Sequence, residues 1–410
     1  MRSPFLKTAL QASLFVCISF LYSHVEAHEH EMHTSLPYKK IAGCEGVELR
    51  CANAATPYLS STGVLWLVWT ANGAVLISKS LDMGKTFAKP IEIARHNQYL
   101  DTGPDARPQL IVDAKGNILI AYTFFKDTHW NAQLNISRST DGGQTFAHPL
   151  PLITHSPSQR FPALGSDSAG NIFIAWVDKR KKEKTSDHAS GSSIAYTWSS
   201  DGGAHFLPER IANDQSCECC RLSVAMDEQK LPVLMYRAIF EGSIRDHGTQ
   251  RFLNPTTPDT LKRVAVDNWK TESCPHHGPS LTVAPSGKMH VAWFTNGQAR
   301  SGIFYANSTD KGLHYSAPRQ IGNPDKNGGR PYVLALQKDV WLTWKEFDGH
   351  QTSIYLERST DEGKTWSKTL ASQTSGYSDH PLLIHAGNQV FLSWLTRENG
   401  YRLIKVSEQT

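Results

Sequence analysis

Four arginines stand just before short apolar segments, and each opens one unit of a repeating pattern. They are Arg107, Arg160, Arg221 and Arg330. Guanidinium groups bind carboxylate, sulfate or phosphate through paired hydrogen bonds. If the units are arranged radially, these arginines converge on one channel, which predicts a binding site for an anionic group. The alternative is that each arginine pairs with an acidic residue of a neighbouring unit and only stabilises the fold.

A second group of reactive side chains is rich in cysteine and histidine. Cys217, Cys219 and Cys220 open one unit, and Cys274, His276 and His277 open the next. Because equivalent positions of adjacent units lie close together, Cys219, Cys220, Cys274, His276 and His277 could bind zinc or copper through thiolate and imidazole ligands. Disulfides are the alternative, for example between Cys220 and Cys274.

The first 27 residues have the pattern of a secretory signal peptide. Arg2 and Lys7 precede an apolar stretch of about fifteen residues, and Val25-Glu26-Ala27 offers a cleavage site. The stretch is shorter than the roughly 20 residues of a membrane span. We therefore expect an exported protein, periplasmic or secreted, with no stable membrane span. Cleavage removes Cys17 and leaves six of the seven cysteines, an even number that favours disulfides, with Cys44 and Cys51 pairing as near neighbours.

The segment 28–35 is predicted to be a histidine-rich tail. Cleavage after Ala27 would make His28 the first residue and His30 the third, behind a free amine, which is an arrangement suited to copper(II). A disordered tail without a metal is the alternative.

An aromatic-ended apolar run recurs every 50 to 60 residues through the rest of the chain. The runs end at Trp69, Tyr122, Trp176, Tyr236, Trp293, Trp344 and Trp394. Periods of this length are typical of arrays in which each unit buries its face against the next. Each unit is interpreted as a four-stranded blade, which predicts an all-β propeller over 36–410, with seven blades favoured over six. The last unit has only three strands, so we expect a strand within 36–50 to close the ring.

Five segments with the pattern Ser-x-Asp-x-Gly-x-x-aromatic follow these runs. They are centred on Asp82, Asp141, Asp201, Asp310 and Asp361. In a hairpin turn the aspartate would accept backbone N–H groups and the glycine would supply a positive φ. We therefore expect these aspartates to be structural rather than catalytic.

The five segments resemble the Asp-box repeats of the sialidase superfamily, and the resemblance covers nearly the whole mature chain as architecture. Arg160-Phe161-Pro162 looks like the family's Arg-x-Pro motif, although it lies in the third unit rather than the first. The resemblance implies Asp187 as the acid/base and Tyr377 as the nucleophile, with Glu241 or Glu218 as its carboxylate partner. Sialidases have six blades, whereas seven units are counted here.

The composition narrows the choice of function. Lys and Arg total 42 against 38 Asp and Glu, a net charge of +4, which gives no indication of nucleic-acid binding. The leading prediction is an exported sialidase-like propeller that recognises an anionic, carboxylate-bearing glycan or another acidic small molecule, as a binder or as an exo-glycoside hydrolase. The alternative is a periplasmic copper-binding propeller without hydrolase activity.

Overall fold

The computed structural model describes residues 44–60, 62–180, 191–271, 273 and 275–406. The chain divides into two units, Met1–Ser35 and Leu36–Thr410, and every described residue belongs to the second. The described residues form antiparallel β-sheets with three short 3-10 helices, η1 (Leu49–Cys51), η2 (Asn97–Tyr99) and η3 (Glu241–Ser243). None of the helices in the described part of the chain is long and apolar enough to cross a bilayer.

Six sheets follow one another along the described chain. The first two are β1 (Ala54–Leu59), β2 (Leu65–Ala71), β3 (Ala74–Ser80) and β4 (Ile91–Arg95), then β5 (Gln109–Val112), β6 (Ile118–Phe125), β7 (Ala132–Ser139) and β8 (Leu150–Pro151). Next come β9 (Gln159–Ser166), β10 (Ile172–Asp178), β11 (Ser192–Ser199), β12 (Arg210–Ser216), β13 (Ser223–Met226), β14 (Pro232–Phe240), β15 (Ile244–Asn254), β16 (Thr257–Pro258) and β17 (Lys262–Arg263). This nine-stranded sheet consists of two groups, β9–β12 and β13–β17. A single residue pair, Ser216 with Ala238, joins the two groups.

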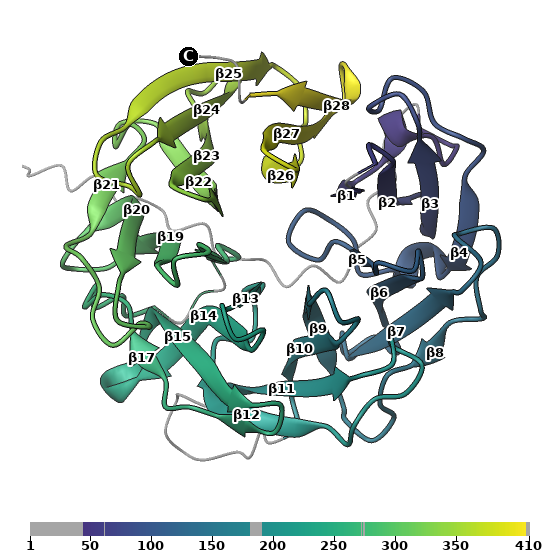
Figure 1. The fold of residues 1–410 in the computed structure, drawn as a ribbon, viewed down its shortest axis with the longest axis horizontal. Coiled ribbons are helices and arrows are strands. Elements are labelled where there is room, and N and C mark those ends of the chain that lie inside the picture. The colour runs from purple at the N-terminus through teal and green to yellow at the C-terminus, as the bar shows by residue number, and fades with distance from the viewer. Residues whose placement is uncertain (1–43, 61, 181–190, 272, 274, 407–410) are drawn as a thin grey trace, which may run out of the picture. The chain divides into compact units, whose positions relative to one another are not determined.

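Three further sheets complete the order. They are β18 (Ser280–Val283), β19 (Met289–Asn296), β20 (Ser301–Ser308) and β21 (Arg319–Ile321), then β22 (Asn327–Leu336), β23 (Asp339–Phe347), β24 (Thr352–Ser359) and β25 (Ser367–Thr374), then β26 (Leu382–Ala386), β27 (Gln389–Thr396) and β28 (Gly400–Lys405). The first strands contact one another in the cycle β1, β5, β9, β13, β18, β22, β26 and back to β1. Figure 1 shows the sheets arranged radially with these strands innermost, which is the architecture of a β-propeller.

The recurring aromatics lie in the second strands and form the centres of the packing between sheets. All seven have 2% or less of their surface exposed, so each is fully enclosed by its neighbours. Trp394, for example, packs in one cluster with Trp341 of the preceding sheet, and Trp69 packs with Phe391 of the last sheet. One large aromatic side chain in each of the seven groups of strands therefore fixes the spacing between the groups.

The five Ser-x-Asp turns join the third and fourth strands of their sheets. In the first, Ser80 donates to Asp82 at 2.7 Å, and Asp82 accepts the backbone N–H of Thr86 at 2.9 Å and its hydroxyl at 2.6 Å. The Ser80 hydroxyl also accepts the N–H of Gly84, whose φ is +84°. In the other four turns the aspartate likewise accepts the backbone N–H of the residue four positions later: Thr145, His205, His314 and Thr365. The carboxylates are therefore occupied in holding the turns.

Acid should destabilise the protein through these turns. Hydrogen bonds from Thr86 lower the pKa of Asp82 to about 2, and those from His314 lower the pKa of Asp310 to about 2, from 3.8. Because the folded pKa lies below the unfolded one, the stabilisation is complete above about pH 4 and is lost as the pH falls through 2. We expect thermal melts to show a Tm that drops between pH 4 and pH 2.

Asparagine variants provide the control for this acid effect. Asp82→Asn and Asp310→Asn should lower the Tm at pH 6, and the difference from the wild type should shrink as the pH approaches 2. A difference that stays constant over this range would contradict a contribution from the ionised carboxylates.

The last sheet has three strands, and the described residues before β1 do not supply a fourth. Residues 44–53 contain η1 instead of a strand, fastened by the disulfide Cys44–Cys51, with an S–S distance of 2.14 Å. The indole of Trp69 donates to the carbonyl of Val47 at 2.9 Å. The Cys44–Cys51 pairing is thus confirmed, whereas a closing strand is wrong for 44–50 and stays a prediction for 36–43, which lie outside the described residues.

A buried ionic network joins the two ends of the ring. Arg107, just before β5, donates to Asp379, just before β26, at 2.5 Å, and also to the carbonyl of Ala55 in β1 at 2.8 Å. Asp379 in turn accepts the backbone N–H of Ala55 at 3.0 Å. The side chains of Arg107 and Asp379 are only 6% and 2% exposed. One charge pair therefore ties the first, second and last sheets together.

Candidate anion-binding site at the channel mouth

Three residues that directly precede the innermost strands, or stand at the start of one, gather around a single carboxylate. Arg330 donates to Asp105 Oδ1 at 3.1 Å, while Arg221 Nη1 lies 3.7 Å and His380 Nδ1 3.9 Å from the same oxygen. Arg221 comes just before Leu222, Arg330 before Pro331 and His380 before Pro381. The shared position in the repeat therefore places these three side chains together at the channel.

Local backbone features direct the two arginines inward. Arg330 has a φ of +60°, and the pairing of β22 with β23 shifts register between Gly329 and Tyr332, which is a bulge. Bulges of this kind redirect one side chain out of the regular pleat. Arg221 passes over Gly278, where any Cβ would collide with the Arg221 side chain. A glycine at 278 is therefore required by the arginine that lies on it.

Positive charge is in excess at this point. Lys345 in β23 is paired in register with Gly329, beside Arg330. Burial lowers the pKa of Arg221 to about 10 and also lowers the pKa of Arg330 and of Lys345, and neighbouring cations add to the effect at Arg221 and Lys345. Burial also holds the pKa of His380 well below its usual value, so this ring is neutral. Arg221 and Arg330 therefore flank Asp105, with Lys345 within electrostatic range, and a bound anion would relieve the repulsion among these cations.

Arg221 carries the clearest sign of an incomplete site. Its Nη1 is buried and, among the described residues, has no hydrogen-bond partner, because Asp105 is too far away at 3.7 Å. An unpaired buried guanidinium nitrogen costs free energy unless a ligand or water satisfies it. Arg221 Nη1 is therefore a buried hydrogen-bond donor that the acceptor atom of a ligand would satisfy.

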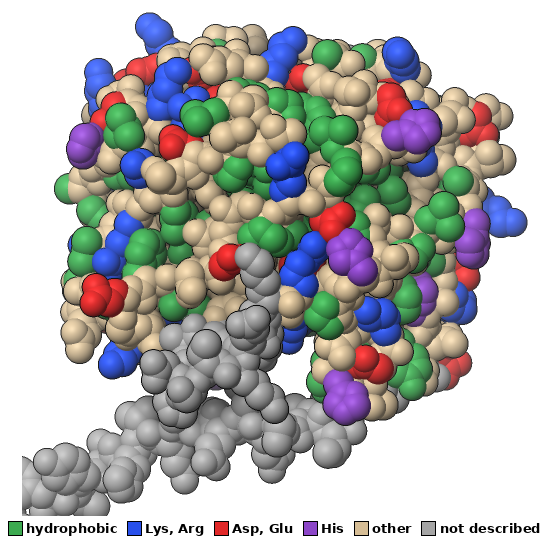
Figure 2. Space-filling model, turned by 90° about the horizontal axis from the view of Figure 1, so that it is seen from below, with side chains coloured by type: hydrophobic (Ala, Val, Ile, Leu, Met, Phe, Trp, Pro, Cys, Tyr) green, Lys and Arg blue, Asp and Glu red, His purple; other side chains and the backbone are tan. Residues whose placement is uncertain are grey.

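Asp105 and Arg221 of this cluster line a cavity of about 180 Å³ inside the ring of first strands. Its walls include Asp105, Arg107, Arg221, Phe161 and Tyr332. The volume lies below the roughly 300–1,000 Å³ that is typical of pockets for drug-sized ligands, which favours a small ligand. Positive charge is not gathered on the outer face drawn in Figure 2, where acidic and basic side chains are interspersed.

Two of the four predicted arginines have a structural role. Arg107 is committed to Asp379 and Ala55, as described above, although its side chain lines the cavity. Arg160 forms two hydrogen bonds with Asp101, at 2.7 and 2.8 Å, and its guanidinium stacks on Phe161. Of the two alternatives, pairing with an acidic residue is therefore observed for Arg107 and Arg160, and a role of either in substrate binding stays a prediction.

The predicted catalytic residues do not form a site in the described chain. Tyr377 donates its hydroxyl to the backbone carbonyl of Asn53 at 2.8 Å, and burial raises its pKa. Glu241 is exposed in η3, and Glu218 pairs with Lys179 at 3.4 Å. The expected pairing of Tyr377 with a glutamate is therefore wrong, because its hydroxyl donates a hydrogen bond to a backbone carbonyl instead. Asp187 lies outside the described residues.

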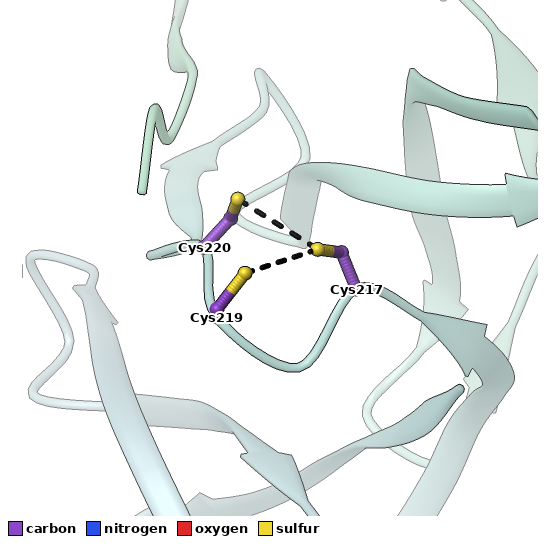
Figure 3. Close-up of side chains that lie close together, drawn as sticks. All are labelled: Cys217, Cys219 and Cys220. Carbon is purple, nitrogen blue, oxygen red and sulfur yellow. Dashed lines mark hydrogen bonds between the residues drawn. The ribbon is translucent and has the colours of Figure 1, made fainter. Parts of the chain in front are cut away.

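The cysteine cluster is present, but without its predicted histidines. Cys217, Cys219 and Cys220 bring their sulfurs together in the loop between β12 and β13 (Figure 3). His276 and His277 are not part of this group, because the ring of His277 stacks on Phe294 with centroids 4.0 Å apart. Cys274, His28 and His30 lie outside the described residues.

Three important residues of the site were not predicted from the sequence. Asp105, Lys345 and Tyr332 lie near the arginines but do not occupy the repeat position that marked the others. The sequence points to Asp105 through its position two residues before Arg107, as an acidic residue close to an arginine. The signal is weak because the partners of Asp105 are Arg221 and Arg330, more than a hundred residues away.

Comparisons with known proteins identify the fold. No family model and no curated protein matches this chain. Among solved structures, an ulvan lyase, a polysaccharide lyase bound to a GlcA(1-4)Rha3S ligand, is 11% identical, with a TM-score of 0.58 over 87% of this chain and 95% of its own.

Two other solved structures share the architecture. A lectin from Burkholderia pseudomallei is 9% identical, with a TM-score of 0.60 over 87% of this chain and 99% of its own. A Hadza microbial sialidase is 14% identical, with a TM-score of 0.52 over 85% of this chain and 74% of its own. At these identities the likeness establishes a common propeller fold.

Proposed function

We propose that this protein is an exported, seven-bladed propeller that recognises a carboxylate-bearing sugar at the mouth of its central channel. The observation that carries the proposal is the buried, unpartnered Nη1 of Arg221 beside Arg330 and Lys345, with Asp105 as the nearest carboxylate. A sugar carboxylate would accept from Arg221 and reduce the repulsion among the three cations. The seven-blade count is supported by the closed cycle of seven first strands.

The structural neighbours agree with a carbohydrate ligand. They include a lyase bound to a GlcA-containing saccharide, a sialidase and a lectin. The cavity of about 180 Å³ favours recognition of a terminal acidic residue over an internal stretch of polymer. Export is part of the proposal and rests on the signal-peptide pattern of residues 1–27.

Recognition is better supported than hydrolysis. Glycoside hydrolysis ordinarily needs two carboxyl groups on either side of the scissile bond. At the mouth Asp105 accepts a hydrogen bond from Arg330 with Arg221 3.7 Å away, and Asp379 is committed to Arg107. Hydrolase activity therefore depends on residues outside this cluster, with Asp187 as the candidate that the sialidase resemblance implies.

A comparison of matched ligands tests the proposal. We expect isothermal titration calorimetry to detect binding of glucuronate or N-acetylneuraminate, and the methyl ester of the same sugar to bind at least about tenfold more weakly. The expected loss follows from the roughly 1.5–3 kcal/mol that a hydrogen bond to a charged group contributes. Equal affinities for acid and ester would contradict recognition of the carboxylate. Release of the fluorophore from a fluorogenic sialoside would show that the protein also hydrolyses the sugar it binds.

A further inference from the structure

A compact three-sulfur group lies in the loop from the end of β12 to the start of β13. The Sγ atom of Cys217 is 3.4 Å from that of Cys219 and 3.9 Å from that of Cys220, and all three sulfurs lie within 4.8 Å of one another. The three residues are only 1–3% exposed. Figure 3 shows the sulfurs turned toward one shared space on the inner side of the loop.

We propose that Cys217, Cys219 and Cys220 bind one copper(I) ion through their three sulfurs. A metal–sulfur distance of about 2.3 Å in a planar three-coordinate site requires sulfurs about 4.0 Å apart. The observed separations of 3.4 and 3.9 Å reach that arrangement with small side-chain rotations. A disulfide would instead require about 2.05 Å between two of the sulfurs and would exclude the third.

The charges around the loop suit a site with more than one thiolate. Arg245 donates to Cys217 Sγ at 3.7 Å, and the buried guanidinium of Arg237 lies within electrostatic range of both Cys217 and Cys220. Three thiolates with one monovalent cation carry a charge of −2, which these two arginines would balance. None of the three sulfurs lines the cavity described above, although Cys220 lies within electrostatic range of Arg221 and Arg330.

Three sulfurs are a ligand set that suits copper(I). Soft thiolates select copper(I), which accepts three ligands, whereas structural zinc takes four in a tetrahedron. Among the described His, Cys, Asp and Glu residues, the cluster has three members and no fourth. A zinc site would have to recruit Cys274 from outside the described residues, and this gives the experiment its control.

The test uses the full chain without an affinity tag, purified without oxygen. Copper(I) is titrated against bathocuproine disulfonate as the competing chelator. We expect one copper(I) per chain, and Cys217→Ser and Cys220→Ser should each weaken binding by more than about 100-fold, since even residues behind a ligand contribute 10–100-fold. Cys274→Ser is the matched control and should keep the wild-type affinity. X-ray absorption should show three sulfur neighbours around the copper.

Other outcomes would overturn the proposal. Zinc bound in preference to copper(I), or loss of copper(I) in Cys274→Ser, would replace the three-sulfur site with a four-ligand one. A disulfide between any two of the three residues, found by mass spectrometry in protein alkylated directly in the cell extract, would exclude the site. If a serine variant fails to fold, copper(I) should still protect all three thiols of the wild type from iodoacetamide, and unprotected thiols would refute the inference.

Discussion

Replacing Arg221 and Arg330 together by glutamine should abolish measurable binding of the carboxylate sugar. Each guanidinium supplies charge and hydrogen bonds at a buried position, where a hydrogen bond to a charged group is worth roughly 1.5–3 kcal/mol. Arg221→Gln alone should weaken binding by about tenfold or more, because its unpartnered Nη1 is the donor most available to a ligand. Titration calorimetry with the acid and its methyl ester measures both effects.

The control is an arginine of the same chain that lies away from the channel. Arg358 pairs with Asp339 at 2.8 Å on the β23–β24 pair, so Arg358→Gln removes the same charge without touching the cavity. This variant should bind like the wild type. If Arg358→Gln and Arg221→Gln weaken binding equally, the effect comes from overall charge and the site is elsewhere. Circular dichroism of each variant confirms that the fold is retained.

The position of each arginine relative to the following strand explains which parts of this site could be predicted. Arg107, Arg221 and Arg330 stand one residue before Pro108, Leu222 and Pro331, whereas Arg160 stands two residues before Pro162. Successive side chains along extended backbone point to opposite sides, so a shift of one residue changes the direction of the side chain. The offset from the following residue therefore separates Arg160 from the other three arginines, and its guanidinium pairs with Asp101 instead.

The elements that depend on local chemistry were the most predictable from sequence. The Ser-x-Asp turns satisfy their own backbone groups within four or five residues, so five copies identify five hairpins. The neutralising partners of the arginines are not local. Arg107 finds Asp379 across 272 positions of sequence, and Arg330 finds Asp105 across 225. A single sequence gives the position of the arginine in its unit but not the residue that the closed ring brings opposite it.

Removing Asp379 should be the most destabilising single change at the closure of the ring. Asp379→Ala leaves the guanidinium of Arg107 buried without its charge partner and leaves the N–H of Ala55 without an acceptor. Breaking a buried ion pair from one side costs about 3–5 kcal/mol. We expect the free energy of unfolding, measured by guanidinium chloride denaturation, to fall by that amount. The matched control is Asp339→Ala, which breaks a more exposed pair with Arg358 and should cost less than about 1 kcal/mol.

A double variant separates the cost of an isolated buried charge from the cost of the lost acceptor for the N–H of Ala55. Arg107→Met with Asp379→Ala removes both charges, so the penalty for an isolated buried cation disappears while the lost acceptor for Ala55 remains, at about 1–3 kcal/mol. The double variant should therefore be more stable than Asp379→Ala alone. If the two losses simply add, the residues do not act as a pair, and the contact between β1 and β26 must close the ring by packing. A non-additive result would instead show that one ion pair joins sheets from opposite ends of the chain.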